Sequence, residues 1–198
     1  ACDNDVVDHQ VVAMEFEEQI GDILQVPTRV SAIKIDGKRA YQRVRDGEEV
    51  ELKARPVTIH SLEVLDQRVV GDWLDVDISV RCSSGTYIRA IARDVGAALG
   101  VGGHLTALRR TAVGPYGLDR AHTLDELADS FTVLPIAEAA RAAFPARDLD
   151  QEAATDVRFG RALDVHLDGL TALFAPEGEF LALYEPRDGV ARAVAVFV

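Results

Sequence analysis

The clearest pattern in the chain is an alternation of apolar and polar residues over 73–82, WLDVDISVRC. Successive side chains of a strand point to opposite faces, so this stretch predicts a strand with one buried face. The apolar positions that share this face are Leu74, Val76, Ile78, Val80 and Cys82. Over 88–99 the apolar period changes to three or four residues, which predicts an amphipathic helix that ends at Gly100.

Weaker patterns divide the rest of the chain into short helices and strands. Before residue 73 they predict a loop over 1–13, a helix over 14–24, a strand over 29–37, a helix within 37–47 and two strand runs separated at Pro56. After residue 100 they predict a strand, or a short helix and a strand, over 104–118, helices over 124–129, 135–143 and 148–160, and three strands after residue 170. This order is typical of an α+β fold, with a mixed, mainly antiparallel sheet and flanking helices.

Local signals place boundaries within this order. Thr123, with Glu126 three residues later, predicts a capping box at the start of a helix. Pro145 marks the expected division between a domain of residues 1–145 and a small, mostly β domain of residues 146–198. No stretch approaches the roughly 20 apolar residues that cross a bilayer, and the acidic start ACDNDVVDHQ lacks a signal-peptide pattern. The cytoplasm is therefore the expected compartment, and no membrane partner is expected.

The charge of the chain is segregated along the sequence. The net charge is −12, yet residues 28–56 hold eight Lys or Arg against five Asp or Glu, and residues 81–120 hold six against two. Residues 1–27, by contrast, hold seven acidic residues and no Lys or Arg. A basic face on an acidic body is the footprint of an RNA-binding surface. Solvated faces without a partner explain the same blocks equally well.

Candidate chemistry lies directly after the predicted strand, in SSGTYIR. A Ser-Ser-Gly turn needs its glycine, but it requires neither Tyr87 nor Arg89. An Arg at a strand end offers a fixed fork for a carboxylate or phosphate, and a Tyr offers a ring for stacking and a phenol that can move a proton. From spacing alone, the simpler interpretation is a Tyr that packs at the core edge and an Arg that extends into solvent.

Other kinds of site have less support. The two cysteines, Cys2 and Cys82, are far apart, and the five histidines lack metal-ligand spacing, so no metal is expected. The run GVGGH at 100–104 follows a helix rather than a strand, which is the wrong context for a dinucleotide loop. No GxSxG nucleophile motif occurs. Basic residues with an aromatic among them suit structured RNA instead, and the RNA-binding candidates are Lys38, Arg39, Arg109 and Arg110.

Three stretches resemble the bacterial tRNA pseudouridine synthase B (TruB) family, in the order and spacing of that family. They are QVPTRVSAIKIDGKRAYQRVRDGEEVELKARPVTI, CSSGTYIRAIARDVGAALGVGGHLTALRRTAVGPY and TLDEL. The resemblance covers roughly residues 14–130, and the tail is more loosely similar to a PUA-like C-terminal domain. It implies a pseudouridine synthase-like fold, here incomplete, and an enzyme that converts the T-loop uridine of tRNA (position 55) to pseudouridine without a cofactor or metal.

The resemblance also implies roles for individual residues. Arg89 would pair with the catalytic aspartate, and Tyr87 would lie beside the flipped base as the candidate base for the carbon-5 proton. Leu108 would line the same pocket, with Lys34 and Tyr41 beside it. The expected partner is the T-stem-loop of tRNA, and the intact enzyme is expected to be a monomer.

One departure from the family pattern leaves the activity of this chain open. The nucleophile of the family is an Asp in a Gly-Thr-Leu-Asp-Pro-type motif, and no such motif occurs here. Asp3, Asp5 and Asp8 stand in a different context. The leading hypothesis is a truncated tRNA pseudouridine synthase that is inactive as this chain alone. The alternatives are a non-catalytic tRNA-binding or RNA-folding module and a plain acidic interaction domain.

Overall fold

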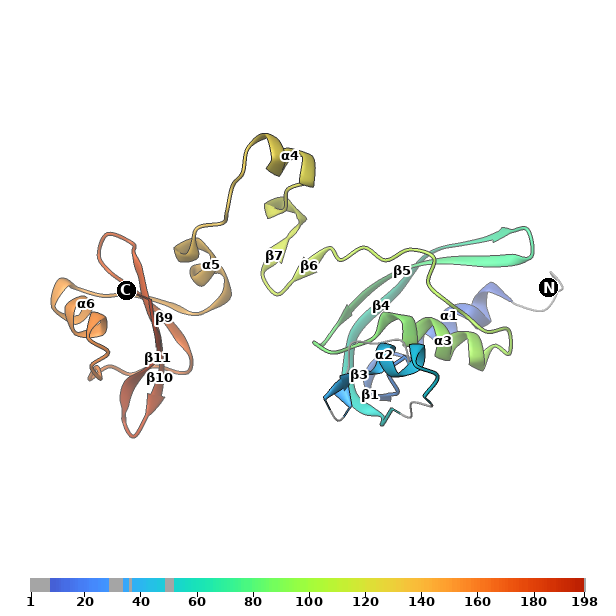
Figure 1. Ribbon diagram of the computed structural model, residues 1–198, viewed down its shortest axis with the longest axis horizontal. Coiled ribbons are helices and arrows are strands. Elements are labelled where there is room, and N and C mark those ends of the chain that lie inside the picture. Colours follow the sequence, from blue (N-terminus) through green and yellow to red (C-terminus); the bar gives the residue numbers. More distant parts are fainter. Residues whose placement is uncertain (1–7, 29–33, 36, 49–51, 198) are drawn as a thin grey trace. The chain divides into compact units, whose positions relative to one another are not determined.

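The computed structural model describes residues 8–28, 34–35, 37–48 and 52–197, and the chain divides into two compact units. The units comprise residues 1–108 and 109–198. Figure 1 labels elements of each unit. The boundary expected at Pro145 stays a prediction.

The first unit is built on an antiparallel sheet in the order β1-β4-β5. Its strands are β1 (Gly21–Gln25), β4 (Arg55–Val70) and β5 (Trp73–Cys82). β5 confirms the strand predicted from alternation, because its apolar face packs on the core. Of the two runs expected on either side of Pro56, the second is confirmed within β4. In the first, residues 52–54 form no strand and residues 49–51 lie outside the described residues. β4 begins only at Arg55, and Pro56 is tolerated because it is the second residue of that strand.

Two helices, α1 (His9–Glu17) and α3 (Ile88–Ala98), pack on this sheet. The buried residues that they share with β4 are Val12, Phe16, Ile59, Leu62, Ile91 and Val95. In Figure 1, α3 runs beside the β4–β5 hairpin, as its predicted apolar stripe requires. A short hairpin of β2 (Lys34–Ile35) and β3 (Lys38–Arg39), followed by α2 (Ala40–Arg45), completes the described part of the unit.

The helix predicted over 14–24 is confirmed only over 14–17, and the loop predicted over 1–13 is wrong from residue 9 onward. The helix begins earlier, because the Asp8 side chain caps it by accepting a hydrogen bond from the Gln10 amide at 2.8 Å. The helix ends at Glu17, and Gly21, with φ +107°, begins β1, so residues 21–25 pair with β4 instead. The pairing partner lies some thirty residues away, beyond the reach of a local apolar period.

The second unit begins with short elements. These are the two-residue strands β6 (Ala112–Val113) and β7 (Tyr116–Gly117), the 3₁₀ turn η1 (Leu118–Arg120), and the helices α4 (Leu124–Asp129) and α5 (Ile136–Ala143). α4 confirms the capping box, since Thr123 accepts from the Glu126 amide and Glu126 accepts from the Thr123 amide. Of the alternatives proposed for 104–118, only the strand is confirmed, and only over β6 and β7, because residues 104–111 form neither a helix nor a strand.

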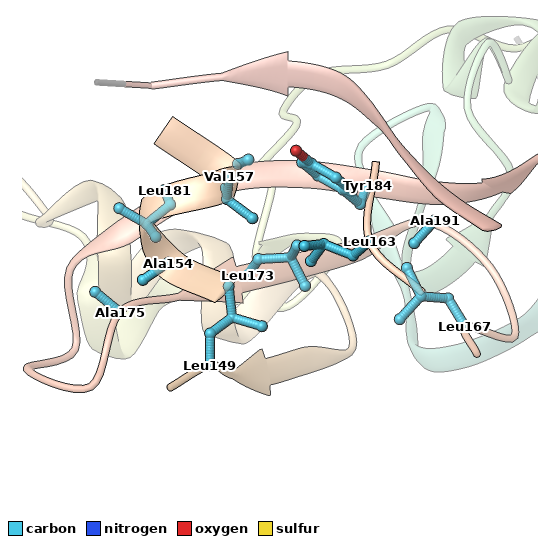
Figure 2. Close-up of a cluster of buried hydrophobic side chains, with 11 residues drawn as sticks. Leu149, Ala154, Val157, Leu163, Leu167, Leu173, Ala175, Leu181, Tyr184 and Ala191 are labelled. Carbon is cyan, nitrogen blue, oxygen red and sulfur yellow. The ribbon is translucent and has the colours of Figure 1, made fainter. Parts of the chain in front are cut away.

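A mixed sheet in the order β11-β10-β9-β8 forms the rest of this unit. Its strands are β8 (Ala146–Asp148), β9 (Thr171–Phe174), β10 (Phe180–Arg187) and β11 (Val190–Val196), and the last three confirm the strands predicted after residue 170. The helix expected over 148–160 is shorter, α6 (Gln151–Arg158), because Asp150 caps it and residues 146–148 pair in parallel with β9. Figure 2 shows the core that α6 and the sheet enclose.

Tyr184 is the largest fully buried side chain in this unit. Its hydroxyl donates a hydrogen bond to the Arg161 carbonyl at 2.8 Å, and burial raises the pKa of the phenol, aided by the negative charge of Asp156. The polar end of an otherwise apolar core residue is therefore satisfied.

Candidate active site

The candidate site is built on the turn that joins β5 to α3. The Ser83 amide donates to the Thr58 carbonyl at 2.8 Å, and the Thr58 amide donates to Ser83 Oγ at 2.9 Å. These bonds continue the pairing of β4 one residue past the end of β5. Thr86 Oγ1 then donates to the Ser83 carbonyl at 2.9 Å, and Gly85, with φ +87°, allows the chain to reverse. The turn is therefore fixed at both ends.

Tyr87 ends this turn and is the N-cap residue of α3. It has extended backbone angles, φ −100° and ψ 103°, and its side chain makes no capping bond. Its backbone is instead bonded to the Gln25 side chain. The Tyr87 amide donates to Gln25 Oε1 at 2.8 Å, and Gln25 Nε2 donates to the Tyr87 carbonyl at 3.2 Å. Tyr87 is half-buried, whereas Gln25 is only 2% exposed.

A concavity of about 370 Å³ lies beside the first turns of α3. Its lining residues are Thr28, Arg89, Arg93, Gly103, His104 and Leu105. Arg89 is exposed at this concave surface. Within the described part of the chain, no hydrogen bond or ion pair involves its guanidinium. Its donors are thus available to an anion.

The second arginine of the concavity is already paired. Arg93 Nε and Nη2 donate to the Asp94 carboxylate at 2.7 and 3.0 Å, and Nη2 also donates to the Val26 carbonyl at 2.8 Å. Arg89 and Arg93 are one helical turn apart on α3, so they lie on the same face. The Arg93 guanidinium therefore joins α3 to residue 26, while the Arg89 guanidinium is available to bind an anion.

Glycines in α3 and directly after it allow the wall of the concavity to lie close to the helix. A Cβ added at Gly103 would lie 2.2 Å from the Ala92 carbonyl oxygen, and one added at Gly96 would lie 2.2 Å from the Gly102 carbonyl carbon. The Gly102 amide donates to the Gly96 carbonyl at 2.7 Å. The run GVGGH thus serves close packing on α3, which places His104 at the concavity. The His104 ring also packs edge-on against the Trp73 ring, with 6.0 Å between the ring centroids.

The other predicted site residues have different surroundings. Leu108 is 63% exposed and does not line the concavity. The side chains of Lys34, Lys38, Arg39 and Tyr41 lie outside the described residues, although their backbones belong to β2, β3 and α2. Arg109 and Arg110 are exposed in the second unit, where Arg110 and Tyr116 line a separate concavity of about 290 Å³.

Sequence reasoning missed Gln25, Thr28, Arg93 and His104. Gln25 lies at the end of an apolar segment, directly before Val26 and Pro27, which could have indicated the end of a strand. Because this segment was predicted to be helical, Gln25 was not considered as a site residue. Arg93 and His104 carry no motif of their own in the sequence.

Strong charge pairs lie elsewhere in the first unit. Arg68 on β4 donates to Asp77 on β5 at 2.7 Å and to Asp66 at 3.0 Å. The hydrogen bond from Arg68 lowers the pKa of the Asp77 carboxyl. This exposed network pairs two neighbouring strands across the sheet.

The described residues contain no group of three or more His, Cys, Asp or Glu placed to hold a metal ion. None of the helices in the described ranges has the length and apolar character needed to span a bilayer.

Comparison with family models accounts for nearly the whole chain. The N-terminal domain of the TruB family of pseudouridylate synthases matches residues 2–88. The C-terminal domain of tRNA pseudouridylate synthase B matches residues 89–142, and the C-terminal model of tRNA pseudouridine synthase II matches residues 144–198.

Curated proteins named tRNA pseudouridine synthase B are similar over most of the chain. The protein of Streptomyces griseus is 59% identical over 184 residues, which cover 89% of this chain and 62% of that protein. The protein of Thermobifida fusca is 53% identical over 198 residues, covering 98% of this chain and 68% of that protein. The chain thus spans roughly two thirds of the length of these relatives or less.

Solved structures share the fold. A Cbf5 complex with Nop10 and Gar1 matches with a TM-score of 0.69 and 24% identity, over 97% of this chain and 62% of that one. An H/ACA ribonucleoprotein bound to a substrate RNA containing 2′-deoxyuridine matches with a TM-score of 0.70 and 23% identity, over the same shares. At this identity the likeness supports the α+β fold alone.

Proposed function

The chain belongs to the TruB family of pseudouridylate synthases, and from this premise we propose that the protein converts the T-loop uridine of tRNA to pseudouridine. The observation that carries the proposal is the first turn of α3. There Arg89 presents an unpaired guanidinium, among the described residues, at a concave surface, and Tyr87 lies two residues before it. An arginine fork held by a rigid helix suits a carboxylate, and a neighbouring phenol suits proton transfer.

In the proposed reaction, the glycosidic bond of the uridine breaks, and the base rejoins the ribose through carbon 5. Arg89 holds the catalytic aspartate ionised, because a nearby guanidinium favours the charged form of a carboxyl. Tyr87 takes the proton that carbon 5 loses when the new bond forms. The base must first leave the stack of the loop, at an unstacking cost of order a few kcal/mol.

We propose that the aspartate comes from a part of the natural protein outside this sequence. The support is the lack of a Gly-Thr-Leu-Asp-Pro-type motif here, together with the share of the relatives that the chain spans. By itself, this chain would then be inactive. The intact mass of the natural protein tests this directly. A mass well above 21.5 kDa would support it, and a mass equal to that of this chain would contradict it.

We further propose how the substrate is bound. Leu108, Lys34 and Tyr41 would border the flipped base, and Lys38, Arg39, Arg109 and Arg110 would contact phosphates of the T-stem-loop. Residues 146–198 would form a PUA-like domain, for which the mixed sheet packed against α6 is the support. The protein would act as a monomer in the cytoplasm, where its tRNA substrate is.

One observation favours a second candidate function. Because the motif of the nucleophile is not in this sequence, a non-catalytic tRNA-binding or RNA-folding module would keep the same basic residues and the same fold. Such a module would bind tRNA but leave its uridines unchanged.

The test is to map pseudouridine in a T-stem-loop RNA after incubation with the natural-length protein. The enzyme hypothesis predicts one pseudouridine, at the T-loop position, and none when that uridine is replaced by cytidine. Tight binding of the RNA without any pseudouridine would favour the non-catalytic module. Neither binding nor modification would favour the plain interaction domain.

A further inference from the structure

Gln25 is a buried polar residue whose side-chain oxygen and nitrogen both form hydrogen bonds with the backbone of one residue, Tyr87. Among the described residues it shares this burial with one other polar side chain, Thr171, which is 6% exposed. Gln25 Oε1 accepts from the Tyr87 amide, and Gln25 Nε2 donates to the Tyr87 carbonyl. A buried amide bonded at both ends is costly to replace, because its removal leaves the Tyr87 amide without a partner and the Tyr87 carbonyl with only its bonds inside α3.

These two bonds fix the backbone on both sides of Tyr87. The amide belongs to the peptide before the Tyr87 Cα and the carbonyl to the peptide after it, so together they restrain both φ and ψ. This is the point at which the turn becomes α3. The Tyr87 carbonyl also accepts the first helical bond, from the Ala90 amide at 2.9 Å. The direction of the Tyr87 side chain and the start of the helix that carries Arg89 therefore depend on one restrained residue.

A second bond ties the same segments together. Arg93, one turn after Arg89, donates to the carbonyl of Val26, the residue after Gln25. Gln25 itself is the last residue of β1, opposite Arg55 of β4. The sheet edge and α3 are thus joined at two successive residues of one segment, while Arg89 between them remains available to bind.

We infer that Gln25 is a positioning residue for the reaction: its amide clamps the Tyr87 backbone and so sets the orientation of Tyr87 and Arg89 toward the substrate. This inference rests on the proposed function. It concerns placement rather than binding, because Gln25 is buried and is not part of the concavity lining.

The test compares two variants of the natural-length protein. Gln25→Met keeps the length of the side chain but removes both hydrogen bonds. We expect its kcat on a T-stem-loop RNA to fall about 10- to 100-fold, since a misplacement of about 1 Å costs of this order. KM should change less than about twofold. Thr171→Val is the matched control, because it removes a buried hydroxyl, bonded to the Gly169 carbonyl, in the other unit. Its kcat should equal that of the wild type.

Amide hydrogen exchange supplies a readout that does not depend on activity. In the wild type, the Tyr87 amide should exchange at least about tenfold more slowly than it does in Gln25→Met. A rapidly exchanging Tyr87 amide in the wild type would overturn the clamp, even if the variant failed to fold. An unchanged kcat in Gln25→Met, or an equal loss in Thr171→Val, would overturn the positioning role. Wild-type protein without activity would defeat the proposed function, while the exchange result would still decide the clamp.

Discussion

Two side chains separated by one residue carry the chemistry proposed for this protein. Tyr87 and Arg89 follow a turn that is bonded to β4 through Ser83 and to β1 through Gln25. One anchor joins the Ser83 side chain to the Thr58 amide of β4, and the other joins the Gln25 side chain of β1 to the Tyr87 backbone, so the turn has little freedom to move either residue. The two residues can therefore be tested separately, one through its charge and geometry and the other through its hydroxyl.

Replacing Arg89 by Lys should lower turnover while leaving tRNA binding nearly unchanged. Lysine keeps the charge but replaces a planar fork with a point donor, so the aspartate would lose its alignment. We expect kcat to fall about 10- to 100-fold, which corresponds to the roughly 1.5–3 kcal/mol of a hydrogen bond to a charged group. The measurement is single-turnover kinetics with the natural-length protein.

The control for this variant is Arg187→Lys. Arg187 is exposed on β10 and pairs with Glu185 at 2.6 Å, far along the chain from the turn. Its replacement should leave turnover unchanged. Equal turnover in Arg89→Lys and the wild type would remove Arg89 from the mechanism.

Replacing Tyr87 by Phe should retain RNA binding and slow the proton-transfer step. The ring proposed to lie beside the base is kept, and only the hydroxyl is lost. General acid–base groups contribute about 10²- to 10⁴-fold, so turnover should fall within this range. Tyr184→Phe is the control, because its buried hydroxyl bonds the Arg161 carbonyl in the other unit. That variant should lower stability by about 1 kcal/mol with normal turnover. Full activity of Tyr87→Phe would exclude the phenol.

Among the elements, α3 determines the shape of the candidate site. Its stripe of apolar residues packs on β4 and β5, and its other side faces the concavity and the glycine-rich segment that follows it. The approach of this segment depends on residues without a side chain, since the backbone at Gly103 lies against the Ala92 carbonyl. The wall of the concavity should thus be sensitive to a single methyl group.

Gly103→Ala should destabilise the first unit. The added Cβ would stand 2.2 Å from backbone oxygen, so α3 and residues 102–105 must separate. We expect a loss of about 1–3 kcal/mol, the usual range for overpacking, in denaturant unfolding. Gly169→Ala introduces the same methyl group where no heavy atom lies within 4 Å, and it should be nearly neutral. Equal stability of the two variants would show that the close approach is not required.

Elements with a long, regular pattern were predictable from the sequence, and elements defined by distant partners were not. β5 and α3 have an unbroken period, and α4 has a complete capping box, so local information was sufficient. β1 was mistaken for part of a helix, because its conformation comes from pairing with β4. The same error hid Gln25, whose hydrogen-bond partner Tyr87 lies 62 residues away. Arg89 could be proposed because SGTYIR carries the resemblance to the family.

Across the whole molecule, charge separates an acidic body from basic segments. The basic residues cluster in 28–56 and 81–120, which include α3 and the segment that leads to Arg109 and Arg110. An acidic protein that binds RNA must do so through these segments, because the net charge of −12 repels phosphates at long range. Binding should therefore combine local attraction with steep screening by salt.

Affinity for tRNA should fall by roughly 10³-fold or more between about 50 mM and about 200 mM salt, if six or more phosphates are contacted. Replacing both Arg109 and Arg110 by Gln should reduce the salt slope by about two. Arg187→Gln, an exposed charge outside the basic segments, should leave the slope unchanged. Fluorescence anisotropy over a salt series measures all three proteins. An affinity independent of salt would contradict phosphate binding by these residues.

The central claim is that the protein isomerises uridine, and the most direct measurement is release of tritium from tRNA that carries 5-tritiated uridine. Formation of the new bond at carbon 5 displaces the hydrogen held there. With the natural-length protein, we expect tritium release from the T-loop uridine in step with pseudouridine formation, and release slowed about 10- to 100-fold by Arg89→Lys. Binding of the tRNA with no release of tritium would contradict the claim and identify the protein as a non-catalytic RNA-binding module.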